Sequence, residues 1–275
     1  MDNPKVSVIL PTYNSGRFIG GAIESILNQT FFDFEFIIID DCSRDNTWDR
    51  IQEYAAKDKR IIARRNNKNI NLSATLNQGI GMARGEYIAR MDHDDISINQ
   101  RLERQANFLD AYPEVGIVGS SIEIIDEQDR TLGFRKYQLN DQDIRKKIFL
   151  YSPFCHPATM IRKRILEMSG NYDATFAPAD DYELYFRLGM HGKFANLHDI
   201  LLQYRIIKKI SMTTGGTKRM EKQTIQVRLK YANHPFYKMD NIDFSYNVIH
   251  YLSLYLMPSK LKAWCFSKFR NSKNC

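Results

Sequence analysis

Three carboxylates stand within four residues, at Asp92, Asp94 and Asp95, directly after the apolar segment 86–91. Alternating apolar positions in that segment predict a buried strand, whose end would deliver the acids to one edge of a sheet. Like charges this close raise one another's pKa, so the cluster favours a bound cation. Oxygen ligands suit Mg²⁺ or Mn²⁺, which leave positions for the oxygens of a phosphorylated substrate. The alternative is a solvated acidic turn that caps a helix starting near Asn99.

Two further acidic pairs are candidates for a site. Asp40 and Asp41 follow the continuous apolar run 34–39, which is typical of a strand buried on both faces. Asp180 and Asp181 are adjacent, and repulsion would raise the pKa of one of them, which suits a base. The plainer interpretations are that the first pair only ends a strand, and that Asp180 caps a helix with Asp181 on its first turn.

The elements that would position these acids alternate along the first 91 residues. Strands are predicted at 5–10, where Pro11 ends the pattern, and at 34–39, 61–63 and 86–91, with helices at 18–27, 47–55 and 74–83. This alternation predicts an α/β fold with a doubly wound, Rossmann-like, mostly parallel sheet and flanking helices. Ligands bind at the carboxyl ends of such strands, where Asp40, Asp41 and residues 11–14 and 92–95 all fall.

The second half of the chain mixes short elements. Strands are predicted at 116–118, 122–125, 158–161 and 201–205, and helices near 141–150 and 182–191. We expect one continuous α/β domain over 1–211 and a helical C-terminal extension over 212–275. Neither GxGxxG nor GxxxxGK[ST] occurs, which disfavours a dinucleotide cofactor and a P-loop.

Composition favours a globular cytoplasmic protein. The 275 residues are 43% hydrophobic and 26% charged, and the four cysteines form no CxxC pair. We find no signal-peptide pattern at the first residues and no apolar stretch long enough to span a bilayer.

The net charge of +7 is concentrated near the C-terminus. The segment 244–275 has no acidic residue and alternates lysine and arginine with aromatic residues and leucine, which is typical of a segment lying on an anionic membrane surface. The alternative is a helix packed on the core with a solvated basic tail. A nucleic-acid-binding protein is disfavoured, because the basic residues accompany no RRM, KH or helix-turn-helix signal.

Four separated motifs occur in a fixed order. Taken together, they make the chain resemble the family 2 inverting glycosyltransferases of GT-A fold over residues 5 to about 211. The motifs are VSVILPTYN at 6–14, IIIDDCSRDNT at 37–47, the cluster at 92–95 and APADDYELYFR at 177–187. Two positions depart from the family pattern. Asn69-Ile70-Asn71 stands where a glycine is common, and Ile207 stands where a histidine often follows the late Tyr-Arg pair.

The resemblance implies roles for residues on the donor side. The loop formed by Pro11, Thr12, Tyr13 and Asn14 would hold the uridine of a nucleotide-sugar, and Asp41 would contact the uracil. Asp94 would be the direct ligand of a Mn²⁺ or Mg²⁺ ion that bridges the diphosphate. Asp92 would belong to the same metal motif, nearer the ribose or donor sugar, and Arg205 would lie near the diphosphate.

The resemblance also implies roles on the acceptor side. Asp181 would be the general base, with Asp180 beside it, and His156 would line the acceptor. From the residue alone, the preferred interpretation of His156 is a structural histidine with a satisfied hydrogen bond. A base is needed because a sugar hydroxyl is a poor nucleophile until a positioned carboxylate takes its proton.

These observations predict a metal-dependent glycosyltransferase that moves a sugar from a UDP-sugar to a hydroxyl of a bacterial surface glycan such as O-antigen, lipopolysaccharide or capsule. The expected acceptor is a lipid-linked oligosaccharide, such as one on undecaprenyl diphosphate, and the expected location is the inner face of the plasma membrane. The rival is a metal-dependent phosphohydrolase with the same acidic edge, in which water attacks the nucleotide-sugar.

Overall fold

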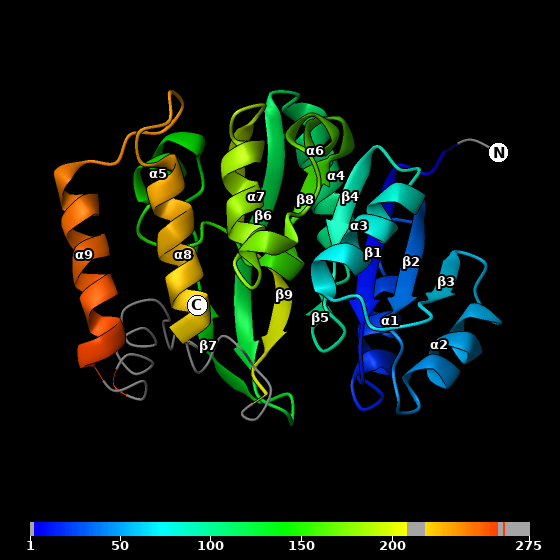
Figure 1. Cartoon of the computed structure of the whole chain (residues 1–275). Coiled ribbons are helices and arrows are strands. Elements are labelled where there is room, and N and C mark those ends of the chain that lie inside the picture. The colour runs from blue at the N-terminus through cyan, green and yellow to red at the C-terminus, as the bar shows by residue number, and fades with distance from the viewer. Residues whose placement is uncertain (1–2, 208–217, 258–260, 262–275) are drawn as a thin grey trace.

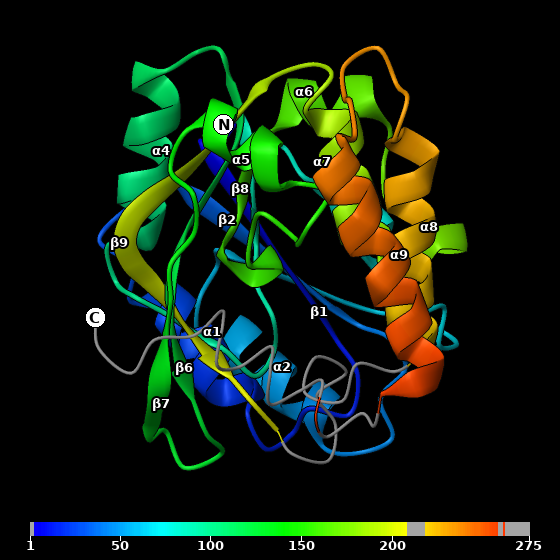
Figure 2. The same ribbon diagram turned by 90° about the vertical axis from the view of Figure 1, so that its left-hand side faces the viewer.

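A computed structural model describes residues 3–207, 218–257 and 261 of the chain. Its centre is a nine-stranded sheet in the order β3-β2-β1-β4-β8-β6-β9-β5, with β7 paired to β6 outside this path. Helices cover both faces of the sheet, and the last two helices stand at one end of the molecule (Figures 1 and 2). This is the α/β architecture with a mostly parallel sheet that the sequence predicts.

The first half is the predicted parallel unit. Strands β1 (Val6–Thr12), β2 (Phe34–Asp40), β3 (Ile61–Arg65) and β4 (Tyr87–Arg90) alternate with α1 (Ile19–Leu27), α2 (Thr47–Ala55) and α3 (Leu72–Met82). Every residue of β1 and β2 is buried, because Val8 and Leu10 pack in the core with α1 while Ile9 packs in the core with α3. Burial on both faces explains the continuous apolar runs.

Strand β1 runs two residues further than predicted. Pro11 pairs with Ile39, and Thr12 pairs with Asp40. On its other side, β1 is paired with β4 only as far as Ile9. A proline is tolerated here because this stretch of β1 has a partner strand on one side only.

The second half contains longer strands than predicted. The segments 116–118 and 122–125 are parts of one strand, β6 (Val115–Ile125), and 201–205 is the end of β9 (Lys193–Arg205). The two strands pair in parallel with register shifts around Ser120 and Ser121, so the polar interruption that separated the predicted strands is absorbed as a bulge. Strand β8 (Met160–Arg162) joins them to β4 by antiparallel pairing, and the remaining strands are β5 (Ile96–Ser97) and β7 (Thr131–Arg135).

The connecting helices differ from prediction mainly at their ends. They are α4 (Arg101–Ala111), α5 (Asp141–Lys147), α6 (Lys163–Ser169) and α7 (Asp180–Leu188). Helix α7 begins two residues earlier than predicted, so Asp180 and Asp181 form its first turn. Helix α6 was not predicted.

The C-terminal helices are α8 (Lys218–Tyr231) and α9 (Asn241–Leu256), which lie side by side (Figures 1 and 2). Helix α8 packs on α7, where the rings of Phe186 and Tyr231 stack at 4.6 Å between centroids. Within the described ranges, no helix is long and apolar enough to cross a membrane. Most of the basic tail predicted to contact a membrane lies outside the described residues.

Candidate active site

The loop after β1 is tied to the loop after β2. Asn14 adopts a φ of +51°, its backbone N–H donates to Ser43 Oγ at 2.9 Å, and its Oδ1 accepts from the backbone N–H of Arg44 at 2.8 Å. Asparagine tolerates this left-handed conformation better than most residues do. Tyr13 at the tip is 40% exposed, which leaves its ring available to a ligand. The predicted role of residues 11–14 in holding a nucleoside stays a prediction.

Asp41 organises the loop after β3. Its carboxylate accepts from Asn66 Nδ2 at 2.8 Å and from the backbone N–H groups of Ile70 at 2.9 Å and Asn71 at 3.0 Å. Asn71 has a φ of +72°, a conformation that favours glycine and that accounts for the glycine common in the family at this loop. Asp41 is only 4% exposed, so its predicted uracil contact stays a prediction.

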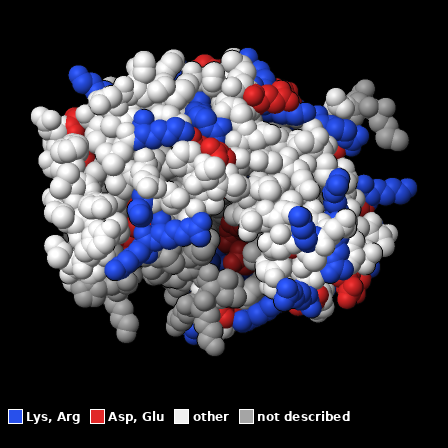
Figure 3. All heavy atoms as spheres, viewed as in Figure 1, with Lys and Arg blue, Asp and Glu red and all other residues white. Residues whose placement is uncertain are grey.

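The acidic cluster follows β4 and holds a candidate metal site. One ligand atom each from Asp92, His93 and Asp94 lies within 4.8 Å of the others, and all three residues are partly exposed. Two carboxylates and an imidazole at this spacing fit a divalent cation such as Mn²⁺. His93 is a third candidate ligand beyond the two predicted acids. In the space-filling view, a hollow in the middle of the face has acidic side chains at its base (Figure 3).

A buried arginine supports the cluster from beneath. Arg90 is 3% exposed, and its Nη2 donates to Asp92 Oδ1 at 2.6 Å. Burial would raise the pKa of Asp92, but the Arg90 charge outweighs it and the pKa is lowered. Burial raises the pKa of Asp94, and the charge of Asp92 adds to that rise. A bound cation would favour the ionised form of both carboxyls.

The third carboxylate of the cluster turns inward, contrary to the expectation that all three share one edge. Asp95 is 1% exposed, its Oδ1 accepts from the backbone N–H of Arg205 at 2.8 Å, and its Oδ2 has no hydrogen-bond partner among the described residues. Asp95 therefore joins the acidic loop to β9.

Arg205 braces the same loop. Its Nε donates to the backbone carbonyl of Asp94 at 2.7 Å, and its Nη1 donates to the carbonyl of Asp126 at 2.8 Å and to the carboxylate of Asp129. The side chain is 4% exposed. It lies beneath the candidate metal loop, and its predicted contact with a diphosphate stays a prediction.

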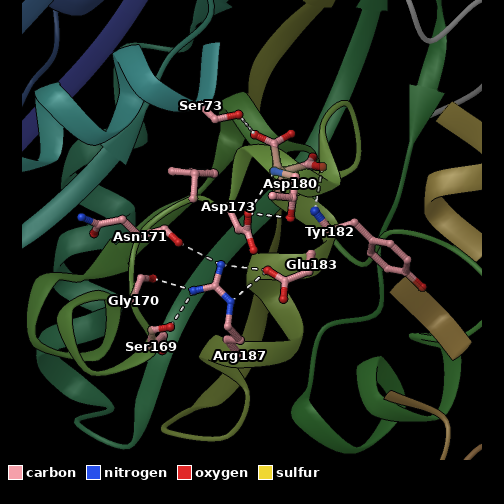
Figure 4. Close-up of polar contacts among 12 residues, drawn as sticks. Ser73, Ser169, Gly170, Asn171, Asp173, Asp180, Tyr182, Glu183 and Arg187 are labelled. Carbon is pink, nitrogen blue, oxygen red and sulfur yellow. Dashed lines mark hydrogen bonds and ion pairs between the residues drawn. The ribbon is translucent and has the colours of Figure 1, made fainter. Parts of the chain in front are cut away.

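The second acidic site is the first turn of α7. Ser73 of α3 donates to Asp180 Oδ2 at 2.6 Å, which ties Asp180 to a neighbouring helix (Figure 4). The N-cap residue is Ala179, so the interpretation of Asp180 as a cap is wrong. Burial, followed by the charge of Asp180, raises the pKa of Asp181 to about 7. A carboxyl group with this pKa can accept a proton near neutral pH.

Helix α7 is anchored at its other end by Arg187. The guanidinium donates to the carbonyls of Ser169 at 2.6 Å, Gly170 at 2.8 Å and Asn171 at 2.9 Å, and it pairs with Glu183 at 2.8 Å (Figure 4). These contacts fix the helix that carries Asp180 and Asp181 relative to the loop after α6.

His156 has a protein partner close to the two acidic sites. Its Nε2 lies 2.7 Å from Tyr172 Oη, and burial followed by the Arg90 charge lowers the pKa of His156 to about 3, which keeps the imidazole neutral. The structural interpretation of His156 therefore has a specific hydrogen bond to support it. The Arg90 and Asp92 charges also influence the pKa of Asp181, so the two predicted acidic sites interact electrostatically.

Sequence reasoning missed Arg90 and Tyr172. A signal existed for Arg90, because a charged residue inside the otherwise apolar segment 86–91 needs a buried partner. No comparable local signal marked Tyr172.

The fold is a GT-A fold. The chain superposes on residues 1–349 of S. aureus TarS in complex with UDP-GlcNAc with a TM-score of 0.71, at 18% identity, covering 96% of this chain and 76% of that 1–349 chain. The family model described as Glycosyl transferase family 2 matches residues 7–169, and the chain belongs to this family.

Two relatives are similar over nearly the whole chain. An uncharacterised glycosyltransferase of Methanocaldococcus jannaschii is 32% identical over 94% of this chain and 91% of its own length. The UDP-Gal:alpha-D-GlcNAc-diphosphoundecaprenol beta-1,3-galactosyltransferase of Escherichia coli is 27% identical over 97% of each. The resemblance inferred from the motifs is thereby confirmed at the level of family and fold.

Proposed function

We propose that this glycosyltransferase is a metal-dependent inverting enzyme that transfers a sugar from a UDP-sugar to a hydroxyl of a lipid-linked glycan. The observation that carries the proposal is that Asp92 and Asp181, which lie in the two acidic sites, have pKa values shifted in opposite directions. Asp92 is held ionised beside Arg90, whereas Asp181 has a pKa raised to about 7. One site is suited to a cation and the other to a proton.

The residues of the chain divide the chemistry. Asp92, His93 and Asp94 would hold the divalent cation, which when bound offsets the negative charge of the leaving diphosphate. Asp181 takes the proton of the acceptor hydroxyl as that oxygen bonds to the anomeric carbon and the bond to the diphosphate breaks. Arg90 keeps Asp92 in place, and Arg205 holds the loop that carries Asp94.

The choice of substrates rests on the relatives. The E. coli relative is named for a UDP-Gal donor and an acceptor linked to diphosphoundecaprenol. Its similarity over 97% of the chain supports a UDP-sugar donor and a lipid-linked acceptor. A relative named as an O-antigen biosynthesis glycosyltransferase, 31% identical over 74% of this chain, supports a role in O-antigen or polysaccharide biosynthesis. A lipid-linked acceptor would place the enzyme at a membrane surface. Screening of UDP-sugar donors would identify the sugar transferred, and analysis of the product would identify the linkage.

Calorimetric titration with UDP, with and without Mn²⁺, tests the donor site. We expect binding that requires Mn²⁺ and that Asp94→Asn abolishes. Asp95→Asn is the matched control, because Asp95 is buried and its Oδ1 accepts from the Arg205 N–H, an acceptor oxygen that asparagine keeps. Equal UDP affinity of all three proteins would contradict the assignment of Asp94.

Turnover assays separate transfer from hydrolysis. With a UDP-sugar and no acceptor, the proposed transferase should release UDP only slowly, and an added lipid-linked acceptor should raise the rate. A rate of UDP release that is fast and indifferent to acceptor would favour the phosphohydrolase.

A further inference from the structure

Helix α9 turns its polar stripe toward the protein and its apolar stripe outward. The inner stripe has a spacing of four, three and four residues and consists of buried or half-buried Asp243, Asn247, His250 and Leu254. The outer stripe has the same spacing and consists of Ser245, Ile249, Leu252 and Leu256. The three aliphatic members of the outer stripe are 66, 50 and 80% exposed, in that order. This is the reverse of the pattern expected for a helix on the surface of a globular protein.

The inward contacts fix this orientation. Arg228 of α8 is 2% exposed, and its Nη1 donates to Asn247 Oδ1 at 3.1 Å and lies 3.3 Å from His250 Nδ1. Asn247 Nδ2 donates to the carbonyl of Phe149 at 3.1 Å, and Asp243 completes a capping box with Asp240. A rotation of α9 that buried the outer stripe would break the bonds of Asn247 and His250 to Arg228 and that of Asn247 to Phe149, and would leave the buried Arg228 charge with only the hydroxyl of Tyr182 and the carbonyl of Leu150 as partners.

Further apolar and aromatic side chains widen the exposed surface. These are Ile242 (76% exposed), Phe244 (56%), Tyr246 (41%), Val248 (42%), Tyr251 (44%) and Tyr255 (63%). A contiguous apolar surface of this kind marks an interaction site. The helix has 16 residues, so it is about 24 Å long, and its polar inner stripe is occupied by the protein. Such a helix is suited to lying in the plane of a membrane surface.

Positive charge near the C-terminal end of α9 indicates which kind of partner the exposed face would bind. Lys218, Arg219 and Lys222 at the start of α8 are exposed, and Lys218 Nζ lies 5.8 Å from the ring centroid of Tyr255 at the end of α9. The sequence from 244 to 275 contains no acidic residue. The one acid of the first turn of α8, Glu221, faces inward at 3.5 Å from His250 Nε2. A second copy of the chain would bring the same positive charge, whereas anionic lipid headgroups bring the opposite charge.

We propose that the outer face of α9, together with the cations at the start of α8, docks on an anionic lipid bilayer. Figure 1 shows α9 as the outermost element of its end of the molecule, with α8 between it and the sheet, so the face is accessible. The proposal deepens the membrane-linked acceptor of the proposed function. The proposed function gives membrane docking its biological role. Docking itself requires neither the nucleotide nor the acceptor, so it can be tested separately.

Vesicle co-sedimentation of the full chain tests the proposal, with phosphatidylcholine vesicles that contain or lack phosphatidylglycerol. We expect binding to the anionic vesicles and at least about tenfold weaker binding by the double variant Ile249→Glu/Leu252→Glu, because two exposed aliphatic side chains that would enter the bilayer are replaced by charges. Leu132→Glu/Leu139→Glu is the matched control. Those leucines are 53 and 44% exposed on another part of the surface, and this variant should bind as the parent does.

A second variant guards against a folding defect in α9. Arg219→Glu/Lys222→Glu changes exposed residues of α8 and should weaken binding to the anionic vesicles in low salt, with the melting temperature unchanged. Absence of parent binding, or equal binding by the parent and the α9 variant, would overturn the proposal. A parent that dimerises without binding vesicles, and that the α9 substitutions make monomeric, would assign the face to a second copy instead. UDP titration of the same variants should be unchanged, which separates this proposal from the proposed donor site.

Discussion

Asp181 combines a raised pKa with a position at the start of α7, next to a second carboxylate that Ser73 holds in place. Asp181→Asn should lower kcat by about 10²- to 10⁴-fold, which is the usual contribution of general base catalysis. UDP affinity in the presence of Mn²⁺ should stay within about twofold, since the nucleotide is assigned to the other acidic site. Steady-state kinetics and calorimetry on the one variant measure both quantities. A parallel loss of UDP binding would show that Asp181 serves the donor side or the fold.

The same carboxyl predicts a pH profile. Only the ionised form of Asp181 accepts a proton, so kcat/KM should rise with pH, reach half its plateau near pH 7 and then level off. Asp180→Asn keeps an acceptor oxygen for Ser73 and removes the neighbouring negative charge, so it should move the inflection to lower pH. Measurement of kcat/KM across the neutral pH range in the parent and in Asp180→Asn tests this expectation. An inflection that stays in place in the variant would mean that another group titrates.

At the residue scale, the sequence was sufficient for acids and insufficient for their partners. Asp92, Asp94 and Asp181 could be proposed as site residues because carboxylates at strand ends and helix starts are visible in the local sequence, and their roles stay predictions. Tyr172 reaches His156 only through tertiary folding, so no spacing in the sequence reveals the contact. The inward turn of Asp95 likewise depends on β9, which lies more than a hundred residues later in the chain.

Arg187 is a polar anchor of the last turn of helix α7. Arg187→Ala removes three bonds to backbone carbonyls and leaves Glu183, whose side chain is 1% exposed, with Lys230 as its remaining ion-pair partner. We expect a loss of about 2–4 kcal/mol of stability, or a melting temperature lower by roughly 5–10 °C. A decrease in kcat should accompany it, because Asp181 moves with the helix.

Arg104→Ala is the control for this prediction. Arg104 also pairs with a carboxylate, that of Asp199 at 2.9 Å, but both side chains are about half exposed. Exposed pairs contribute about 0–1 kcal/mol, so the melting temperature should change little. Thermal denaturation followed by circular dichroism measures both variants, and equal shifts would show that the buried contacts of Arg187 do not stabilise α7.

At the element scale, the parallel half of the sheet could be predicted well and the other half poorly. Strands β1 and β2 are buried on both faces, so their apolar runs are continuous and easily found. Strand β6 contains Gly119, Ser120 and Ser121 in its middle, and local propensity divides it in two. Pairing along β9 overrides that propensity, and pairing is a property of the folded sheet.

Across the whole molecule, the two halves of the sheet meet at the acidic loop. Strand β4 of the parallel half supplies Asp92 and Asp94 at its end, and β9 of the other half supplies Arg205, which binds the loop from below. The C-terminal helices then attach to the same body through α7 and Arg228. The candidate site and the proposed docking face are therefore parts of one connected structure.

Arg228→Met tests whether the attachment of the C-terminal helices can be weakened without loss of the candidate active site. The substitution leaves the carbonyl of Leu150, the side chain of Asn247 and the hydroxyl of Tyr182 without their donor, at a cost of about 1–3 kcal/mol for each buried group. Helix α9 should open more often, so chymotrypsin should cut at its aromatic residues several times faster than in the parent.

UDP binding with Mn²⁺ should be retained in Arg228→Met, because the site is built on β1, β2, β4 and α7 and not on α9. Arg228→Lys keeps a charge but loses the fork that contacts three acceptors at once, so its cleavage rate should lie between those of the parent and the methionine variant. Limited proteolysis read by mass spectrometry, with calorimetry on the intact proteins, measures the two effects separately. Loss of UDP binding without faster cleavage in α9 would mean that Arg228 supports the site directly and that the C-terminal helices are part of its framework.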